Sequence, residues 1–293
     1  MQSNPDSPSW EAPSVRRGLL TCPHLSRVRA MWVKLLGTGS ADGLPNPWCR
    51  CPTCAEARTA GMVRSNTSVL VDGRLLLDCG PEAPRQAVRF GSDLAAVEVV
   101  AIGHAHHDHM DPSFLLYRSW VDDRPLQVFG PPAVIAQCQA WLDPDQSGVT
   151  LRELAAGEVI GAAGYSLTVL EARHHAFGKA VVYLVDDGSS RLLYATDTGL
   201  LPAATMAALR DARLDLLLLE ETFGTKIDGG EAHLHLATFA EQLDQLRSIG
   251  AVTPATQVVA IHLSHHNPPL AELREALATM GAVLYPDGTQ LQV

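Results

Sequence analysis

The sequence predicts a layered α/β fold in which two β-sheets pack together and helices cover the outside. Short runs with strand character come first and are joined as hairpins, whereas later strands alternate with segments of helical periodicity. At 293 residues and 46% hydrophobic content, the chain has enough apolar mass for one large α/β domain or two small ones.

The strand segments are short and punctuated by turn residues. Two of them contain hairpins, because Asp-Gly pairs at 72–73 and 187–188 stand between apolar runs. The segments with strand character are 33–39, 67–80, 97–105, 126–132, 165–174, 180–199, 214–222, 257–266 and 282–293.

Helices are predicted where apolar residues recur three or four positions apart. These segments are 111–121, 132–142, 202–212, 236–250 and 270–281. Residues 1–30 are instead rich in Pro, Ser and Arg without periodicity, and a clean strand pattern opens at Met31. We expect 1–30 to be a disordered or misassigned tail and 31–293 to form a single domain.

Charge and composition narrow the range of partners. The formal net charge of −10 repels a phosphate backbone, so long nucleic acids are not expected as partners. No apolar run approaches the roughly 20 residues that cross a bilayer, and the start lacks the apolar core of a secretory signal. We therefore expect a cytoplasmic protein without a membrane partner.

The stretch HAHHDHMD, residues 104–111, is the strongest chemical signal in the chain. It puts four histidines and two aspartates directly after an apolar run, a pattern that arises by chance in on the order of one chain in a thousand. In an extended segment His104, His106 and Asp108 would share one face and His107 the other. Asp111 is then expected to cap the following helix, with Pro112 in its first turn. Such an anchored loop can hold ligands around one or two metal ions.

Further metal-binding residue types recur where predicted strands end. They are His174 and His175, then Asp197, and finally His262, His265 and His266. Any one of them alone would more often be a capping or packing residue than a ligand. Their recurrence at strand ends predicts that they meet the 104–111 loop at one site.

Together the segments HAHHDH, a later His, ATDTG and IHLSH resemble the five-part metal signature of the metallo-β-lactamase superfamily. The resemblance covers residues 31–293 and implies a four-layer αββα sandwich with a dinuclear metal site. Within that superfamily the stretch GTGSADGLPNPWCRCPTCAEAR, residues 37–58, resembles the PhnP-like cyclic phosphodiesterases.

The resemblance implies two divalent ions, zinc or manganese, in the active site. Its ligand set carries over as His104, His106 and His174 for one ion, and Asp108, His109 and His262 for the other, with Asp197 bridging. His175 is adjacent to His174 and remains an alternative to it. His107 is left out.

A second metal site is predicted from WCRCPTC. Cys49, Cys51 and Cys54 supply three thiolates, and His265 would complete a closed Cys₃His structural zinc site. His266 is a rival for the fourth position, and three reduced cysteines in a turn are the alternative. Three cysteines within six residues also fit a metal better than a disulfide framework.

Two residues are nominated for catalysis. A dinuclear centre makes water a nucleophile at neutral pH, and Asp108 is placed to orient that water as well as to ligate. The leaving oxygen needs a proton donor, and we nominate His233, because its spacing to Leu236 and Thr238 resembles the PhnP-like pattern. Capping of the next helix is the alternative role, with His235 as a competing neighbour. Glu220 and Glu221 are candidates to orient His233.

These features predict a metal-dependent hydrolase, a phosphodiesterase that acts on a small ester such as a cyclic ribosyl or nucleotide-like phosphate. One alternative is a ribonuclease of the tRNA 3′-processing branch, toward which Glu220 and Glu221 lean and which the net charge disfavours. Another is a lactonase, a thioesterase or a small-molecule-binding protein of cofactor biosynthesis with the same fold. The family likeness is also consistent with a homodimer.

Overall fold

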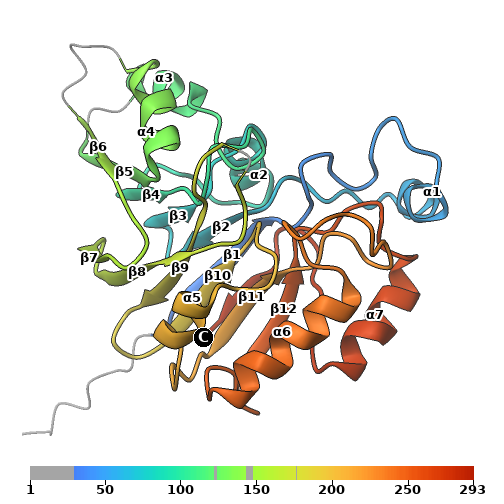
Figure 1. The fold of residues 1–293 in the computed structure, drawn as a ribbon. Coiled ribbons are helices and arrows are strands. Elements are labelled where there is room, and N and C mark those ends of the chain that lie inside the picture. Colours follow the sequence, from blue (N-terminus) through green and yellow to red (C-terminus); the bar gives the residue numbers. More distant parts are fainter. Residues whose placement is uncertain (1–29, 122–123, 143–147, 176) are drawn as a thin grey trace, which may run out of the picture.

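The computed structural model describes residues 30–121, 124–142, 148–175 and 177–293. The predicted tail at 1–30 therefore lies outside the described residues except for its last residue. Two sheets lie face to face with helices outside each of them, which confirms the predicted αββα sandwich (Figure 1).

The first sheet has seven strands in the order β13-β1-β2-β3-β4-β5-β6. β1, β2, β3 and β13 pair antiparallel, and β3 to β6 run parallel. Their bounds are β1 Trp32–Gly37, β2 Ser68–Val71, β3 Leu75–Leu77, β4 Val99–Ala101, β5 Leu126–Gly130, β6 Val149–Glu153 and β13 Gln290–Gln292.

The second sheet has six strands in the order β12-β11-β10-β9-β8-β7. β7 to β10 form an antiparallel meander, and β10, β11 and β12 run parallel. The bounds are β7 Val159–Ala162, β8 Tyr165–Glu171, β9 Val181–Asp186, β10 Arg191–Ala195, β11 Leu216–Glu220 and β12 Gln257–Ile261.

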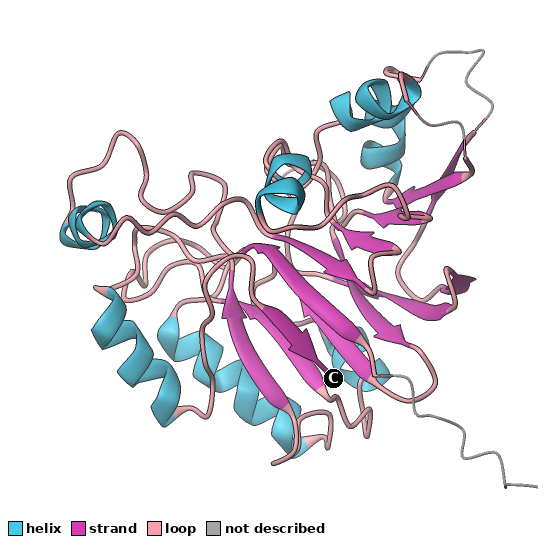
Figure 2. Cartoon of the chain, turned by 180° about the vertical axis from the view of Figure 1, so that it is seen from behind, coloured by secondary structure: helices cyan, strands magenta, loops and turns pink. Residues whose placement is uncertain are grey.

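Helices cover both outer faces (Figure 2). The first sheet carries α2 Ala83–Arg89, α3 Ser113–Ser119 and α4 Pro132–Gln139. The second carries α5 Ala203–Ala208, α6 Leu236–Ser248 and α7 Leu270–Thr279. α1, Pro52–Thr59, stands apart from both groups in Figure 1 and packs on a small cluster of its own around Leu44, Cys54 and Ala57.

Strand β3 shows how the sequence produces these layers. Leu75 and Leu77 point into the core between the sheets, whereas Leu76 points outward and packs beneath the helices. All three are buried, because β3 is covered on both faces, and a continuous apolar run is the pattern expected for such a strand. The β2–β3 hairpin turns at Asp72 and Gly73, both with positive φ, as the Asp-Gly signal predicts.

Four described elements have no counterpart in the predicted set, namely α1, α2, β6 and β7. β6 and β7 lie at the edges of their sheets and keep several exposed positions, so their apolar patterns are weak.

The prediction that Asp111 caps the helix was one residue off. α3 begins after Pro112, and Asp111 Oδ1 accepts a hydrogen bond from the Ser113 amide at 3.0 Å.

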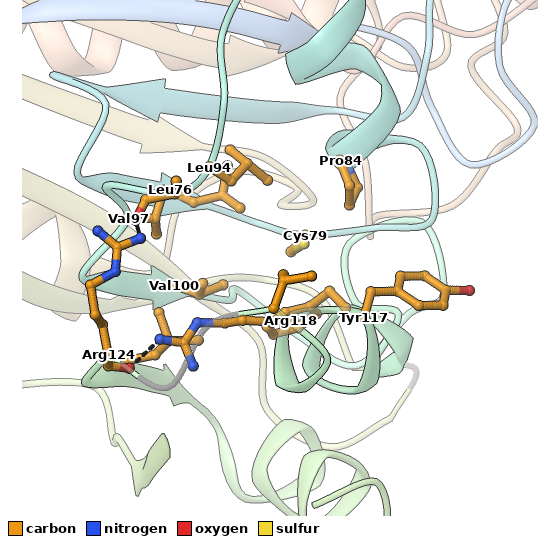
Figure 3. Close-up of a pocket in the computed structure, with 13 residues that line it drawn as sticks. Leu76, Cys79, Pro84, Leu94, Val97, Val100, Tyr117, Arg118 and Arg124 are labelled. Atoms are coloured by element: carbon orange, nitrogen blue, oxygen red, sulfur yellow. Dashed lines mark hydrogen bonds between the residues drawn. The ribbon is translucent and has the colours of Figure 1, made fainter. Parts of the chain in front are cut away.

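An apolar cavity of about 570 Å³ lies on the outer side of the first sheet, where residues of β3 and β4 meet the α3 helix (Figure 3). Cys79 lines it together with aliphatic side chains, and Arg118 and Arg124 stand at one side.

Within the part of the chain that is described, none of the helices combines the length and apolarity required to cross a membrane.

The core between the sheets should dominate folding stability. Leu218 in β11 is fully buried there, so Leu218→Ala should lower the free energy of unfolding by about 2–5 kcal/mol through lost burial and a cavity. Leu116→Ala, at an exposed position of α3, is the control and should change it by less than about 1 kcal/mol. Urea denaturation of metal-depleted protein measures both, and equal losses would contradict this assignment of the core.

Candidate metal centre and active site

The 104–111 loop follows β4, and residues 107–109 form a turn within it. The carbonyl of His106 accepts hydrogen bonds from the amides of His109 at 3.1 Å and Met110 at 3.0 Å. The predicted alternation stops at this turn, which brings His109 back to the site that His104, His106 and Asp108 share. His107 is exposed, in agreement with its exclusion.

One group of donor atoms comes from both sheets. His104 Nε2 and His174 Nε2 lie 2.8 Å and 3.1 Å from His106 Nδ1. They also lie 3.9 Å and 3.8 Å from Asp197 Oδ1. The four donor atoms all lie within 4.8 Å of one another. His174 is the buried member of its pair, whereas His175 is exposed and outside this group.

A second group shares Asp197. His109 Nε2 lies 2.6 Å from Asp197 Oδ2 and 2.9 Å from Asp108 Oδ2. His262 Nε2 lies 3.1 Å and 3.4 Å from the same two oxygens. Asp197 thus turns Oδ1 toward one group and Oδ2 toward the other, which is the position predicted for a bridging ligand.

The packing of these groups fits divalent cations. His109 Nε2 is buried and forms no hydrogen bond, although two carboxylate oxygens lie within 2.9 Å. In the other group three imidazole nitrogens face one another with separations close to the roughly 3.3 Å between nitrogens that share one tetrahedral zinc at about 2.0–2.1 Å. A cation bound between such atoms would be coordinated by their lone pairs, which otherwise repel one another.

Burial sets the charge of the ligands. Removal from water lowers the pKa of His104, His106 and His174, so these imidazoles are neutral and their lone pairs are available. Burial opposes ionisation of Asp108 and Asp197, yet the neighbouring His109 holds the pKa of both carboxyls well below the usual range. Those same carboxylates, against the effect of burial, raise the pKa of His109, and a bound cation would replace that proton.

Sequence reasoning missed Asp78, which supports the centre from β3. Its Oδ2 lies 2.7 Å from His109 Nδ1 and accepts a hydrogen bond from the Tyr194 hydroxyl at 2.8 Å, while Oδ1 accepts from the Gly103 amide at 2.8 Å. A carboxylate on Nδ1 fixes the tautomer and turns Nε2 toward the ion. The only signal in the sequence is an aspartate directly after the apolar run of residues 75–77.

His233 lies beside the ligand groups. Its Nδ1 is 3.0 Å from Glu220 Oε1 and 3.8 Å from Asp197 Oδ1, and its ring stacks on His262 at 5.6 Å with an interplanar angle of 9°. Burial opposes protonation, but the Glu220 carboxylate raises the pKa of His233 to about 9. The Glu220 carboxylate thus favours the protonated form of His233.

The neighbouring residues have separate roles. Glu220 also accepts from the amide of Thr198 at 2.6 Å, which fixes the carboxylate that holds His233. Glu221 turns away and accepts from the Gly224 amide at 2.9 Å. His235 is the N-cap residue of α6, and its amide donates a hydrogen bond to the Thr238 hydroxyl at 2.9 Å. His233 therefore does not cap this helix.

The predicted structural site is only partly assembled in the described residues. The sulfurs of Cys49, Cys51 and Cys54 lie within 4.8 Å of one another, and this group does not include a ring nitrogen of His265. His265 is nevertheless close, because Cys51 Sγ lies 3.7 Å from its main-chain oxygen. His265 Nδ1 is 2.7 Å from Asp42 Oδ2, which leaves Nε2 for a metal, and His265 as ligand stays a prediction.

Among the described residues, the two remaining cysteines, Cys79 and Cys138, belong to no group of metal-binding side chains. Burial raises the pKa of Cys79 and raises that of Cys138 to about 12, so neither thiol is reactive. Cys22 lies outside the described residues. The cavity beside Cys79 is lined by none of the metal-binding histidines and is separate from the site (Figure 3).

Comparisons with known proteins agree with this fold. A family model described as a β-lactamase superfamily domain matches residues 73–263, well over half of the chain. Among solved structures, a diphosphatase of the PhnP family superposes with a TM-score of 0.71 at 23% identity, covering 90% of this chain and 98% of that one. This likeness shows the fold.

Two curated relatives are similar in sequence. An octanoyltransferase of Porphyromonas gingivalis is 26% identical over 254 residues, which cover 83% of this chain and 48% of that protein. A ribonuclease Z of Mycobacterium marinum is 33% identical over 116 residues, which cover 38% of this chain and 37% of that protein. The chain thus spans about half or less of the length of both relatives.

Metal analysis tests the predicted sites. Purified protein should hold about three ions per chain, two in the active site and one at the cysteines. Cys51→Ser should remove one of them, because Cys51 belongs to the cysteine group alone, whereas Cys138→Ala should remove none. Mass spectrometry of the metal content measures both. Native protein with one ion or none would contradict the assignment.

Asp78→Asn should weaken binding of the active-site metal roughly 10–100-fold, because the amide no longer holds His109 as a carboxylate does. Asp72→Asn is a matched control at the other end of β3, since Asp72 also accepts a hydrogen bond from a tyrosine hydroxyl, that of Tyr165 at 2.6 Å. Competition with a chromophoric chelator gives the affinities. An equal loss in both variants would show a general effect on folding instead.

Proposed function

The chain belongs to the metallo-β-lactamase superfamily and has the hydrolase fold of that family, and from this premise we propose that it is a metal-dependent phosphodiesterase. Its substrate would be a small phosphate ester, such as a cyclic ribosyl or nucleotide-like diester. One observation carries the proposal: two groups of metal-binding side chains share the carboxylate of Asp197. Such paired sites suit displacement at phosphorus, because both the attacking and the leaving oxygen need charge stabilisation.

Two divalent ions at these groups would lower the pKa of water toward neutrality and neutralise the phosphoryl oxygens. The protein supplies the remaining functions. Asp108 turns Oδ2 toward His109 and His262, so its other oxygen is available to orient the attacking water by accepting a hydrogen bond.

His233 is proposed as the proton donor to the leaving oxygen. Glu220 holds Nδ1, which leaves Nε2 as the donating atom, and stacking on His262 keeps the ring beside the ligand groups. An alkoxide leaving group requires such a proton, because its conjugate acid is very weak. A protonated imidazole at the centre therefore favours phosphate ester cleavage, in line with the fold likeness to a PhnP-family diphosphatase.

A second candidate is a ribonuclease of the tRNA 3′-processing kind. The similarity to ribonuclease Z of M. marinum favours it. The net charge of −10 argues against it, because affinity for tRNA depends on cationic contacts with phosphates. The similarity to an octanoyltransferase leaves acyl chemistry, as in a lactonase or thioesterase, as a further alternative.

A substrate panel separates these functions. Protein loaded with manganese or zinc should hydrolyse a chromogenic phosphodiester in preference to a phosphomonoester, a lactone, a β-lactam or a tRNA precursor. Activity on the lactone alone would exclude the phosphodiesterase, and specific cleavage of the tRNA precursor would establish the second candidate.

Asp108→Ala should lower kcat by orders of magnitude and leave the fold intact, because it removes a metal ligand and the orienting oxygen together. Asp111→Ala is the control from the same loop, since the Asp111 side chain accepts a hydrogen bond from the Ser113 amide at the start of α3 and belongs to neither ligand group. Steady-state kinetics and circular dichroism measure activity and folding. Unchanged turnover in Asp108→Ala would refute its role.

His233→Gln should act according to the leaving group. Hydrolysis of a diester with a nitrophenolate leaving group should fall only a few-fold, because nitrophenolate needs no proton, whereas an alkyl diester should lose roughly 100–10,000-fold in kcat. His235→Gln should spare both substrates, since His235 lies at the helix start. Equal losses on the two diesters would mean that His233 does not act as the proton donor.

A further inference from the structure

Phe177 presents an exposed aromatic ring at the edge of the metal centre. All six phenylalanines lie within the described residues, and Phe177, with 58% of its surface accessible, is the one that is exposed. It follows His174 by three residues in the connection between β8 and β9. Its ring centroid lies 5.1 Å from that of His106, and the two planes are perpendicular.

Phe223 lies beside His233 and is half-buried. Its ring lies 5.2 Å from His233, Gly229 closes on its edge so tightly that a Cβ there would come within 2.4 Å, and the Lys226 ammonium lies 5.8 Å from its centroid. Phe223 is thus a wall of the site. Phe177 keeps a surface free for another molecule.

A series of ring contacts links Phe177 to His233. Phe177 contacts His106, which contacts His174 at 4.9 Å, and His174 contacts His233 at 4.9 Å. His233, the proposed proton donor, and the exposed Phe177 are therefore the two ends of this series of contacts. If the leaving oxygen faces His233, the ester arm that stays on phosphorus extends toward Phe177.

We propose that Phe177 is a specificity-determining residue that stacks on the nucleobase of a nucleotide diester. The base belongs to the arm that the product phosphate retains. This inference rests on the proposed phosphodiesterase function and narrows it from small phosphate esters to nucleotide-like ones. A nucleobase is a flat π-system that a short sugar links to phosphate, and aromatic side chains bind such bases by stacking without requiring a particular sequence.

The experiment compares two diesters with the same nitrophenolate leaving group, one a thymidine 5′-phosphate ester and the other its analogue without a base. The manganese-loaded native protein should prefer the thymidine ester in kcat/KM by about tenfold, as expected for one stacked base. Phe177→Ala should abolish the preference by raising KM for the thymidine ester alone, and Phe177→Trp should restore it. Trp141→Ala, at another exposed aromatic position, should leave the preference intact.

A structural role for Phe177 would affect both diesters equally, and that result, like an unchanged preference in Phe177→Ala, would overturn the proposal. A defect confined to a tRNA precursor would overturn it as well. Binding of 2-aminopurine riboside 5′-monophosphate, followed by its fluorescence, provides a readout independent of turnover. If the native protein hydrolyses neither diester, the phosphodiesterase assignment fails. Weaker binding by Phe177→Ala would still support a base-stacking role, and equal binding would refute it.

Discussion

The position of the Asp197 carboxylate is the constraint on which the rest of the site depends. Asp197 follows β10 in a left-handed backbone conformation, with φ of 47°, so the chain turns sharply and aims both oxygens into the space between the two groups of histidines. His262 follows β12 with φ of 58° and approaches the same carboxylate. An L-residue adopts this conformation at an energetic cost, which the surrounding core must offset. The strain is local, and it lies where chemistry needs the backbone to expose a side chain.

The sheets explain why residues so distant in sequence meet. β10, β11 and β12 are parallel neighbours, so Asp197, Glu220 and His262 emerge at one edge of the second sheet. The 104–111 loop follows β4 of the first sheet, and its side chains complete both ligand groups. Each ligand group therefore contains side chains from both sheets. His233 lies in the connection between β11 and α6, and Glu220 holds its ring in place.

The sequence predicted the layers, the two hairpins and the loops that meet at the centre, because apolar periodicity and Asp-Gly turns are local signals. It did not predict β6 and β7, whose edge positions weaken the apolar pattern, or the turn that brings His109 back toward His106. It also did not predict the role of Asp78, because a single aspartate after a strand gives no local signal that it contacts His109, 31 residues further along. The sequence alone could not decide whether His174 or His175 faces the centre, because the two are adjacent histidines. Only the folded chain shows that His174 is the buried one.

The contacts of Asp78 have a consequence for how the protein matures. This carboxylate ends a strand of the first sheet, yet it accepts a hydrogen bond from Tyr194 of the second sheet while it holds the His109 ring. The ligands are therefore oriented only once the halves of the sandwich have closed on each other. Ions that bind to this oriented ligand set would therefore stabilise the closed sandwich itself.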